Sequence, residues 1–406
     1  MDTLTQTAPA QRKPLPVFLR ILCCIVFLLC SVALPSLTHF INAAVAGQPS
    51  VILNVMVYSV LGVCLVFALF FCRKPVFLTC TILSAGPLAW LLPELSAYYV
   101  SLLFATFAGA ALLTDAKGAW YLLFCLGVPA AYGLATLIAG NPLVGLLVLV
   151  PASGAVALAA CDRKKVSFIP SVSITTAAVL STFAIILFVD LLVAGMPFSI
   201  DGVRDVIKDY HASLTEQGEQ SIALLIETGM FSSDITTEQM TEFAQSVATI
   251  TLCLAPGAYI MLGWIVSFIA HRGYAALTLG KLPAKDCPVH LCAYNPSVPT
   301  AVLMLLCYGA MLIGMFFEGG EIVIMIALNL LLVLTPILGV RGIASIVNHF
   351  KRATFKWPLI ITYAISLFIL GFAVIPMLAF FGAFAVILHA IASALEKKMN
   401  SSQGGQ

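Results

Sequence analysis

Apolar stretches about as long as a bilayer is thick fill most of this 406-residue chain, and short polar connections separate them. An α-helix needs about 20 apolar residues to cross the hydrocarbon core, and its backbone satisfies its own hydrogen bonds there. The sequence therefore predicts an all-α polytopic integral membrane bundle of about 10 to 12 transmembrane helices. The candidate spans are Val17–Phe40, Val51–Cys72, Val76–Leu92, Leu95–Leu113, Ala119–Ile138, Leu143–Ala160, Ser171–Met196, Val247–Ala270, Val298–Phe317, Ile322–Val340, Pro358–Val374 and Met377–Ala394.

The composition excludes a soluble fold. Hydrophobic residues make up 61% of the chain and charged residues 9%, whereas soluble domains carry roughly 25% charged residues. The net charge of +2 gives no electrostatic support for binding a nucleic acid. Lipid is therefore the expected partner, and no nucleic acid is expected.

The positive charges predict the orientation of the bundle. Apart from Arg204 and Lys208, every Lys and Arg falls in alternate connections or at the two ends. Cytoplasmic connections carry an excess of Lys and Arg, so that side is the predicted cytoplasm. We expect a multi-pass protein of the bacterial cytoplasmic (inner) membrane, with both termini in the cytoplasm.

Five segments follow from the spans and the charges. They are a cytoplasmic N-terminal segment (1–16), an N-terminal bundle of about seven spans (17–196), an acidic extracytoplasmic helical segment (197–246), a C-terminal bundle of about five spans (247–395) and a disordered tail (396–406).

The acidic segment is predicted to be helical. Apolar residues recur every three or four positions, which is typical of an amphipathic helix, at Ile200, Val203, Ile207, Tyr210 and Leu214. Thr236 and Gln239 have the spacing of a capping box, so a second helix can start there and run into the next span. Two interpretations remain open: a solvated hairpin on the outer surface, or a lid over an outward-facing cavity.

Polar residues within or beside the spans are the candidate site. Ionisable groups in a membrane are costly, so each is a functional candidate. Those expected to line a polar vestibule and bind substrate are Asp190, His39, Glu94 and Asn329. Pro256 and Gly257 fall inside the eighth span and are expected to form a hinge, because proline interrupts the helical hydrogen bonds.

Other polar groups have weaker indications. The hydroxyls of Ser171, Ser173, Thr175 and Thr176 can either satisfy backbone carbonyls or line a polar path. Cys287, His290 and Cys292 lack the paired spacing of a zinc site, and His271 could join them only by folding back, so no metal site is predicted. Most of the 12 cysteines lie in or beside apolar stretches, which argues against a disulfide framework. Phosphate-binding and hydrolase motifs are absent from the sequence, so we expect no cofactor and no enzyme.

The last 160 residues or so resemble the YybS-like family of bacterial polytopic membrane proteins, whose function is unknown. The resemblance lies in an ordered pattern: Glu238 to Glu242, Leu254-Ala255-Pro256, Tyr294-Asn295-Pro296 with Pro299, Asn329, Val340-Arg341-Gly342-Ile343-Ala344, Trp357-Pro358 and Pro376. Such proteins are distantly similar to the S-components of energy-coupling-factor transporters. Those proteins capture a micronutrient and are driven by separate ATPase and scaffold subunits.

The resemblance implies a membrane protein that binds or transports a small solute without its own ATPase. A small-molecule ligand and separate energising subunits are then the expected partners. Two alternatives remain open. One is a polytopic transferase acting on lipid-linked glycans at the outer face, for which Arg204 and His211 are the available polar residues. The other is a non-catalytic assembly or scaffold protein.

Overall fold

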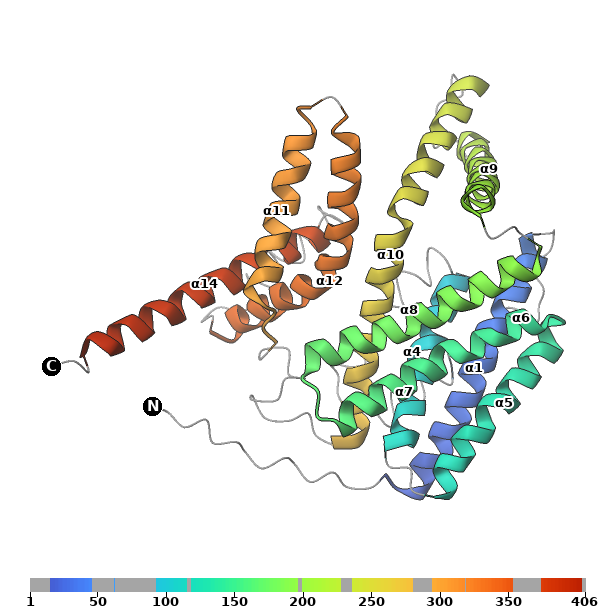
Figure 1. Cartoon of the computed structure of the whole chain (residues 1–406), viewed down its shortest axis with the longest axis horizontal. Coiled ribbons are helices and arrows are strands. Elements are labelled where there is room, and N and C mark those ends of the chain that lie inside the picture. Colours follow the sequence, from blue (N-terminus) through green and yellow to red (C-terminus); the bar gives the residue numbers. More distant parts are fainter. Residues whose placement is uncertain are drawn as a thin grey trace. The chain divides into compact units, whose positions relative to one another are not determined.

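The computed structural model describes residues 15–45, 62, 93–114, 118–195, 199–227, 236–279, 294–317, 319–352 and 374–403. These residues are overwhelmingly helical and include no strand, which confirms the expected all-α fold. The helices (Figure 1) are α1 (Val17–Val45), α4 (Pro93–Thr114), α5 (Ala119–Ala139), α6 (Pro142–Gly145), the 3-10 helix η1 (Leu146–Val148), α7 (Leu149–Arg163), α8 (Phe168–Val193), α9 (Ile200–Glu227), α10 (Thr237–Leu279), α11 (Val298–Gly314), α12 (Glu321–Arg352) and α14 (Val374–Gln403).

Seven of the described helical stretches are long and apolar enough to cross a membrane, and two shorter apolar helices accompany them. Nine of the expected spans fall on these helices. The other three, Val51–Cys72, Val76–Leu92 and Pro358–Val374, lie outside the described residues except for Gly62 and Val374. The structure thus supports a polytopic membrane bundle in the part that it describes.

The chain divides into two compact units. The first comprises Met1–Leu187, Leu262–Asn295 and Ala344–Thr354, and the second comprises Phe188–Met261, Pro296–Ile343 and Phe355–Gln406. The division falls inside α8, α10 and α12, so each of these helices contributes residues to both units.

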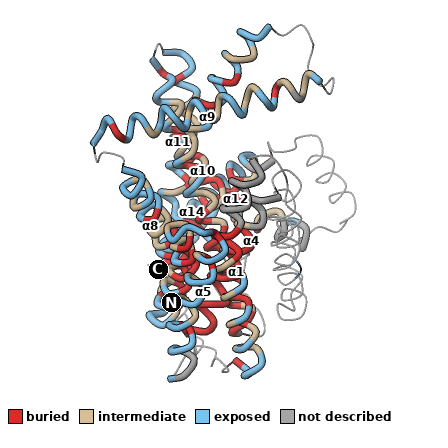
Figure 2. Tube along the Cα trace, turned by 90° about the vertical axis from the view of Figure 1, so that its right-hand side faces the viewer, coloured by how far each residue is buried: buried red, intermediate tan, exposed pale blue. Residues whose placement is uncertain are grey.

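The first unit is built on α1, which packs against α4 and α5, while α4 also packs against α7. Gly109 on α4 lies where these helices meet: a Cβ at this position would be 2.9 Å from both Ala155 and Phe27. Phe27, Phe104 and Phe107 are fully buried around it. Figure 2 shows the buried stretches in the region of α1 and α4. Small residues at helix crossings let the backbones approach closely, which is how helices associate in lipid.

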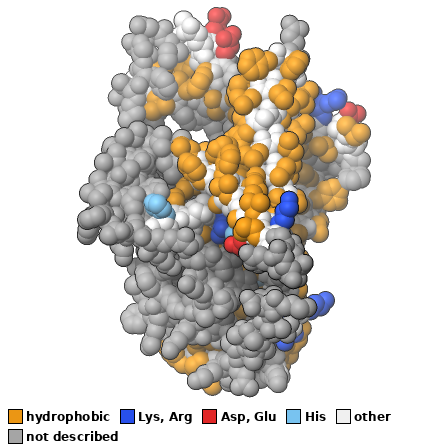
Figure 3. Space-filling model, turned by 90° about the vertical axis from the view of Figure 1, so that its left-hand side faces the viewer, with side chains coloured by type: hydrophobic (Ala, Val, Ile, Leu, Met, Phe, Trp, Pro, Cys, Tyr) orange, Lys and Arg blue, Asp and Glu red, His pale blue; other side chains and the backbone are white. Residues whose placement is uncertain are grey.

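The second unit has its own core between α11, α12 and α14. Met304, Leu338, Ala379, Ala383 and Val386 are buried there. The backbone of α14 meets that of α12 so closely that a Cβ on Gly382 would collide with the carbonyl of Leu338. The outward faces of these helices carry exposed apolar side chains, and Figure 3 shows hydrophobic groups over most of the described surface on the face viewed. Such a surface fits a lipid environment.

The predicted capping box at the start of α10 is confirmed. The backbone N–H of Thr236 donates to Gln239 Oε1 at 3.1 Å, and the N–H of Gln239 donates to Thr236 Oγ1 at 3.3 Å. From this cap α10 runs as one continuous helix of 43 residues. The acidic segment therefore continues directly into the next span, as the sequence predicts.

Candidate functional site

Pro256 lies inside α10, and the residue after it, Gly257, bonds to Asn329 of α12. Proline has no N–H, so Pro256 cannot donate to the carbonyl four residues before it, and its ring crowds that turn. In a membrane, polar side chains of neighbouring helices commonly bond to the backbone near such a proline. Asn329 makes bonds of this kind to α10.

The side-chain amide of Asn329, on α12, lies between the two backbone groups that would normally bond to each other across this turn. The N–H of Gly257 donates to Asn329 Oδ1 at 2.8 Å, and Asn329 Nδ2 donates to the carbonyl of Cys253 at 2.7 Å. Asn329 Nδ2 also donates to the carbonyl of Met325 in its own helix, at 3.0 Å. We call the pair of interhelical bonds, to Gly257 and Cys253, the Asn329 bridge.

Glycine at position 257 makes this approach geometrically feasible. A Cβ there would lie 2.7 Å from Asn329 Oδ1, 2.8 Å from the Asn329 carbonyl oxygen and 3.0 Å from its Cα. Two of these atoms belong to the backbone of α12, so they could not rotate away. Any larger residue at position 257 would push α10 and α12 apart.

The four predicted binding residues divide between the units. Asp190 and Asn329 belong to the second unit, where Asp190 is exposed on the last turn of α8 and Asn329 is partly buried in the bridge. His39 and Glu94 lie on α1 and α4 in the first unit, and their side chains are outside the described residues. The structure joins Asn329 to Gly257, next to Pro256, whereas a common vestibule formed by the four residues remains a prediction.

A second polar cluster, in the first unit, surrounds His271 on α10. Its Nε2 lies 3.1 Å from Thr175 Oγ1 and 3.4 Å from Ser171 Oγ, both on α8. The Phe168 ring meets the imidazole edge-on with centroids 5.9 Å apart. All four side chains are buried. We call these residues the His271 cluster.

The hydroxyls of this stretch of α8 bond to backbone carbonyls. Thr175 Oγ1 donates to the carbonyl of Ser171 at 3.0 Å, and it also lies 3.1 Å from His271 Nε2. Ser173 and Thr176 donate to carbonyls of their own helix in the same way, at 3.1 and 2.9 Å. Of the two interpretations for these hydroxyls, satisfaction of backbone carbonyls is observed at Ser173, Thr175 and Thr176.

Sequence reasoning considered His271 only as a metal ligand and missed this cluster. The signal that was present is the spacing of Ser171 and Thr175, which places both hydroxyls on one face of α8. Nearby in the same unit, Tyr274 Oη donates to Asp162 Oδ2 at 2.7 Å and links α10 to the end of α7. Burial raises the pKa of Tyr294, which lies just before α11 and packs edge-on against Phe168.

The structure describes some of the residues considered for metal binding or for a transferase. The described residues contain no group of three or more His, Cys, Asp or Glu side chains that could hold a metal ion. Cys287, His290 and Cys292 are outside those residues. Two residues were considered for a transferase. Arg204 Nη1 lies 3.6 Å from Asp201 Oδ1, and His211 Nε2 lies 3.0 Å from Thr249 Oγ1.

Comparison with known proteins gives one match. The model of a family described as predicted membrane protein (DUF2232) matches residues 100–387, which is more than half of the chain. The match spans most of both units and extends well beyond the C-terminal 160 residues of the predicted resemblance. No curated protein and no solved structure matches the chain.

Proposed function

We propose that this chain, which belongs to the DUF2232 family of predicted membrane proteins, binds or transports a small solute and uses the Asn329 bridge as its moving part. The observation that carries the proposal is the Asn329 amide, which bonds to the Gly257 N–H and the Cys253 carbonyl in the turn of α10 next to Pro256. Discontinuous helices within the membrane commonly form transporter binding sites because they offer polar backbone groups, and at Pro256 the hydrogen bonding of α10 lacks one donor.

The bridge has the chemistry of an exchangeable contact. An amide side chain can donate twice and accept through two lone pairs, and Asn329 uses both donors and one acceptor position. A solute that carries both a donor and an acceptor could replace the amide at Gly257 and Cys253 without leaving either backbone group unpaired. Exchange of this kind would couple binding to a change in the packing of α10 against α12, because an orphaned backbone group in lipid is costly.

The remaining parts of the proposal follow from the sequence. Asp190, His39 and Glu94 would line the route of the solute from an outer vestibule. Separate energising subunits would drive uptake, as in the S-components that the sequence distantly resembles, because the chain carries no phosphate-binding motif of its own. The protein would lie in the bacterial inner membrane with both termini in the cytoplasm.

A ligand screen on the full-length protein tests the proposal. Purified protein in lipid nanodiscs would be heated with a panel of amino acids, nucleosides and water-soluble vitamins, one compound at a time. A compound that binds the native state raises Tm, with about 2.7 kcal/mol of stabilisation at 100 times Kd. We expect at least one compound of the panel to raise the Tm of the wild-type protein.

The variants Gly257→Ala and Gly339→Ala test whether ligand binding depends on the Asn329 bridge. Gly257→Ala disturbs the Asn329 bridge, whereas a Cβ on Gly339, in the same helix as Asn329, would meet none of the described atoms within 4 Å. The Tm shift should disappear in the first variant and persist in the second. The proposal fails if no compound stabilises the wild-type protein, or if both variants respond to a binding compound as the wild type does.

A further inference from the structure

Helix α9 carries a row of apolar side chains that nothing in the described structure covers. Ile200, Val203, Ile207 and Tyr210 recur at intervals of three and four, and they are between 52% and 83% exposed. This spacing places all four on one face of the helix. We call this row the α9 stripe.

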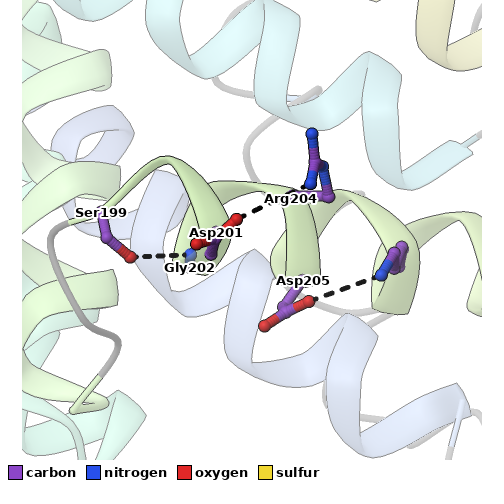
Figure 4. A network of polar contacts seen from close by, with 6 residues as sticks. Ser199, Asp201, Gly202, Arg204 and Asp205 are labelled. Atoms are coloured by element: carbon purple, nitrogen blue, oxygen red, sulfur yellow. Dashed lines mark hydrogen bonds and ion pairs between the residues drawn. The ribbon is translucent and has the colours of Figure 1, made fainter.

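The opposite side of α9 is charged, and two of its ion pairs lie along the helix. Arg204 is 3.6 Å from Asp201 and Lys208 is 3.7 Å from Asp205 (Figure 4), and all four side chains are well exposed. Ser199 Oγ accepts from the N–H of Gly202 at 3.0 Å and caps the start of the helix. The polar face is therefore suited to water, and its charges are largely balanced in the half of α9 that bears the stripe.

Helix α9 packs against α10 through other residues. His211 Nε2 lies 3.0 Å from Thr249 Oγ1, and Thr241 Oγ1 donates to Glu219 Oε1 at 2.7 Å. Between these contacts, a Cβ on Gly218 would come within 3.2 Å of Ala244. In Figure 1, α9 is seen nearly end-on where it crosses α10, which is seen along its length. This contact holds α9 on α10, and within the described structure the four side chains of the α9 stripe stay more than half exposed.

The crossing lies at the level where α10 begins to show an apolar outer surface. Phe243, Val247 and Ile250 are exposed on α10 between and beside the residues that contact α9. The apolar helix α8 ends at Val193, only seven residues before Ile200. The helices on either side of α9 in the sequence thus both enter their apolar segments close to it, which is where the bilayer boundary is expected.

We infer that α9 is an interfacial helix whose stripe is embedded at the boundary between lipid headgroups and acyl chains. An amphipathic helix with a charged face and an exposed apolar face lies in the plane of the interface. Lipid is the occupant that fits, because the stripe adjoins the exposed apolar surface of α10 and because Tyr210 is of the type enriched at membrane interfaces. This placement differs from both a solvated hairpin and a free lid.

Fluorescence quenching by brominated lipids tests this inference. The full-length variants Ile207→Trp and Asp209→Trp would be reconstituted in vesicles whose acyl chains carry bromine near the headgroup end, and in matched vesicles without bromine. The four native tryptophans supply a baseline, which is measured on the wild-type protein. The emission added by Ile207→Trp should be blue-shifted and largely quenched by bromine, whereas the emission added by Asp209→Trp should remain unquenched.

Three outcomes overturn the inference. Equal, unquenched and red-shifted emission from both variants would show a solvated helix, and blue-shifted but unquenched emission from Ile207→Trp would show that protein covers the stripe. Equal quenching of both variants would show that α9 does not lie with one face in lipid. If Ile207→Trp does not fold, Val203→Trp and Asp205→Trp provide the same comparison one turn earlier.

Discussion

The amide of Asn329 bonds to the backbone of Gly257, 72 residues earlier in the chain, with an N···O distance of 2.8 Å. A side chain from another helix thereby bonds to the backbone of a helix turn next to a proline. The consequence for stability is direct, because one side chain of α12 bonds to two backbone groups of α10.

Asn329→Leu should destabilise the protein. Leucine has a similar size but can neither donate nor accept, so the bonds to the Gly257 N–H and the Cys253 carbonyl would be lost. A typical hydrogen bond contributes about 0.5–1.5 kcal/mol to stability. Reversible unfolding in mixed detergent micelles would measure the loss, and the exposed Asn295 offers a control as Asn295→Leu. Equal stability of the two variants would contradict the bridge.

Gly257→Ala should also destabilise the protein, although alanine is normally the better helix former by about 1 kcal/mol. The added methyl group would collide with the Asn329 carbonyl oxygen at 2.8 Å and force the two helices apart. Gly339→Ala should be neutral or stabilising, since its methyl group meets no atom of the described part of the chain within 4 Å. Thermal unfolding of both variants would measure the difference, and the same sign of Tm change in both would exclude a close contact at Gly257.

Thr175→Val should weaken the packing of α8 against α10 by about 0.5–1.5 kcal/mol, the net value of a typical hydrogen bond. Valine keeps the shape of threonine but removes the hydroxyl that lies 3.1 Å from His271 Nε2. Thr182→Val is the matched control, because the Thr182 hydroxyl donates only to the carbonyl of Ala178 in its own helix, at 2.8 Å. Chemical shifts of the His271 ring in selectively labelled protein should change in the first variant and remain constant in the second.

Tyr274→Phe should weaken the contact between the end of α7 and α10. The phenol donates to the carboxylate of Asp162 at 2.7 Å, and bonds to charged groups contribute about 1.5–3 kcal/mol. Tyr308→Phe serves for comparison, because its hydroxyl makes a longer bond of 3.4 Å to the Pro376 carbonyl. Hydrogen exchange of the amides around Asp162 should accelerate only in Tyr274→Phe, and an unchanged exchange rate there would count against the contact.

Local patterns in the sequence were sufficient to predict the helical class and the positions of many helices. The apolar length of each span and the three-residue spacing of Thr236 and Gln239 are properties of neighbouring residues, and both predict what the structure shows. The amphipathic pattern of Ile200 to Tyr210 likewise identified α9. These features depend on backbone hydrogen bonds and on hydrophobicity within a few turns.

Among the candidate site residues, the sequence by itself identified Pro256, Gly257 and Asn329 as unusual, because proline and a polar amide are costly within an apolar span. Only the tertiary structure decided that Asn329 meets Gly257, and that His271 contacts α8. Contacts between residues 72 or 96 positions apart depend on which helix faces pack together. That choice is made by close approaches such as those at Gly257 and Gly382, where the absence of a side chain allows two backbones to meet, and no local pattern encodes it.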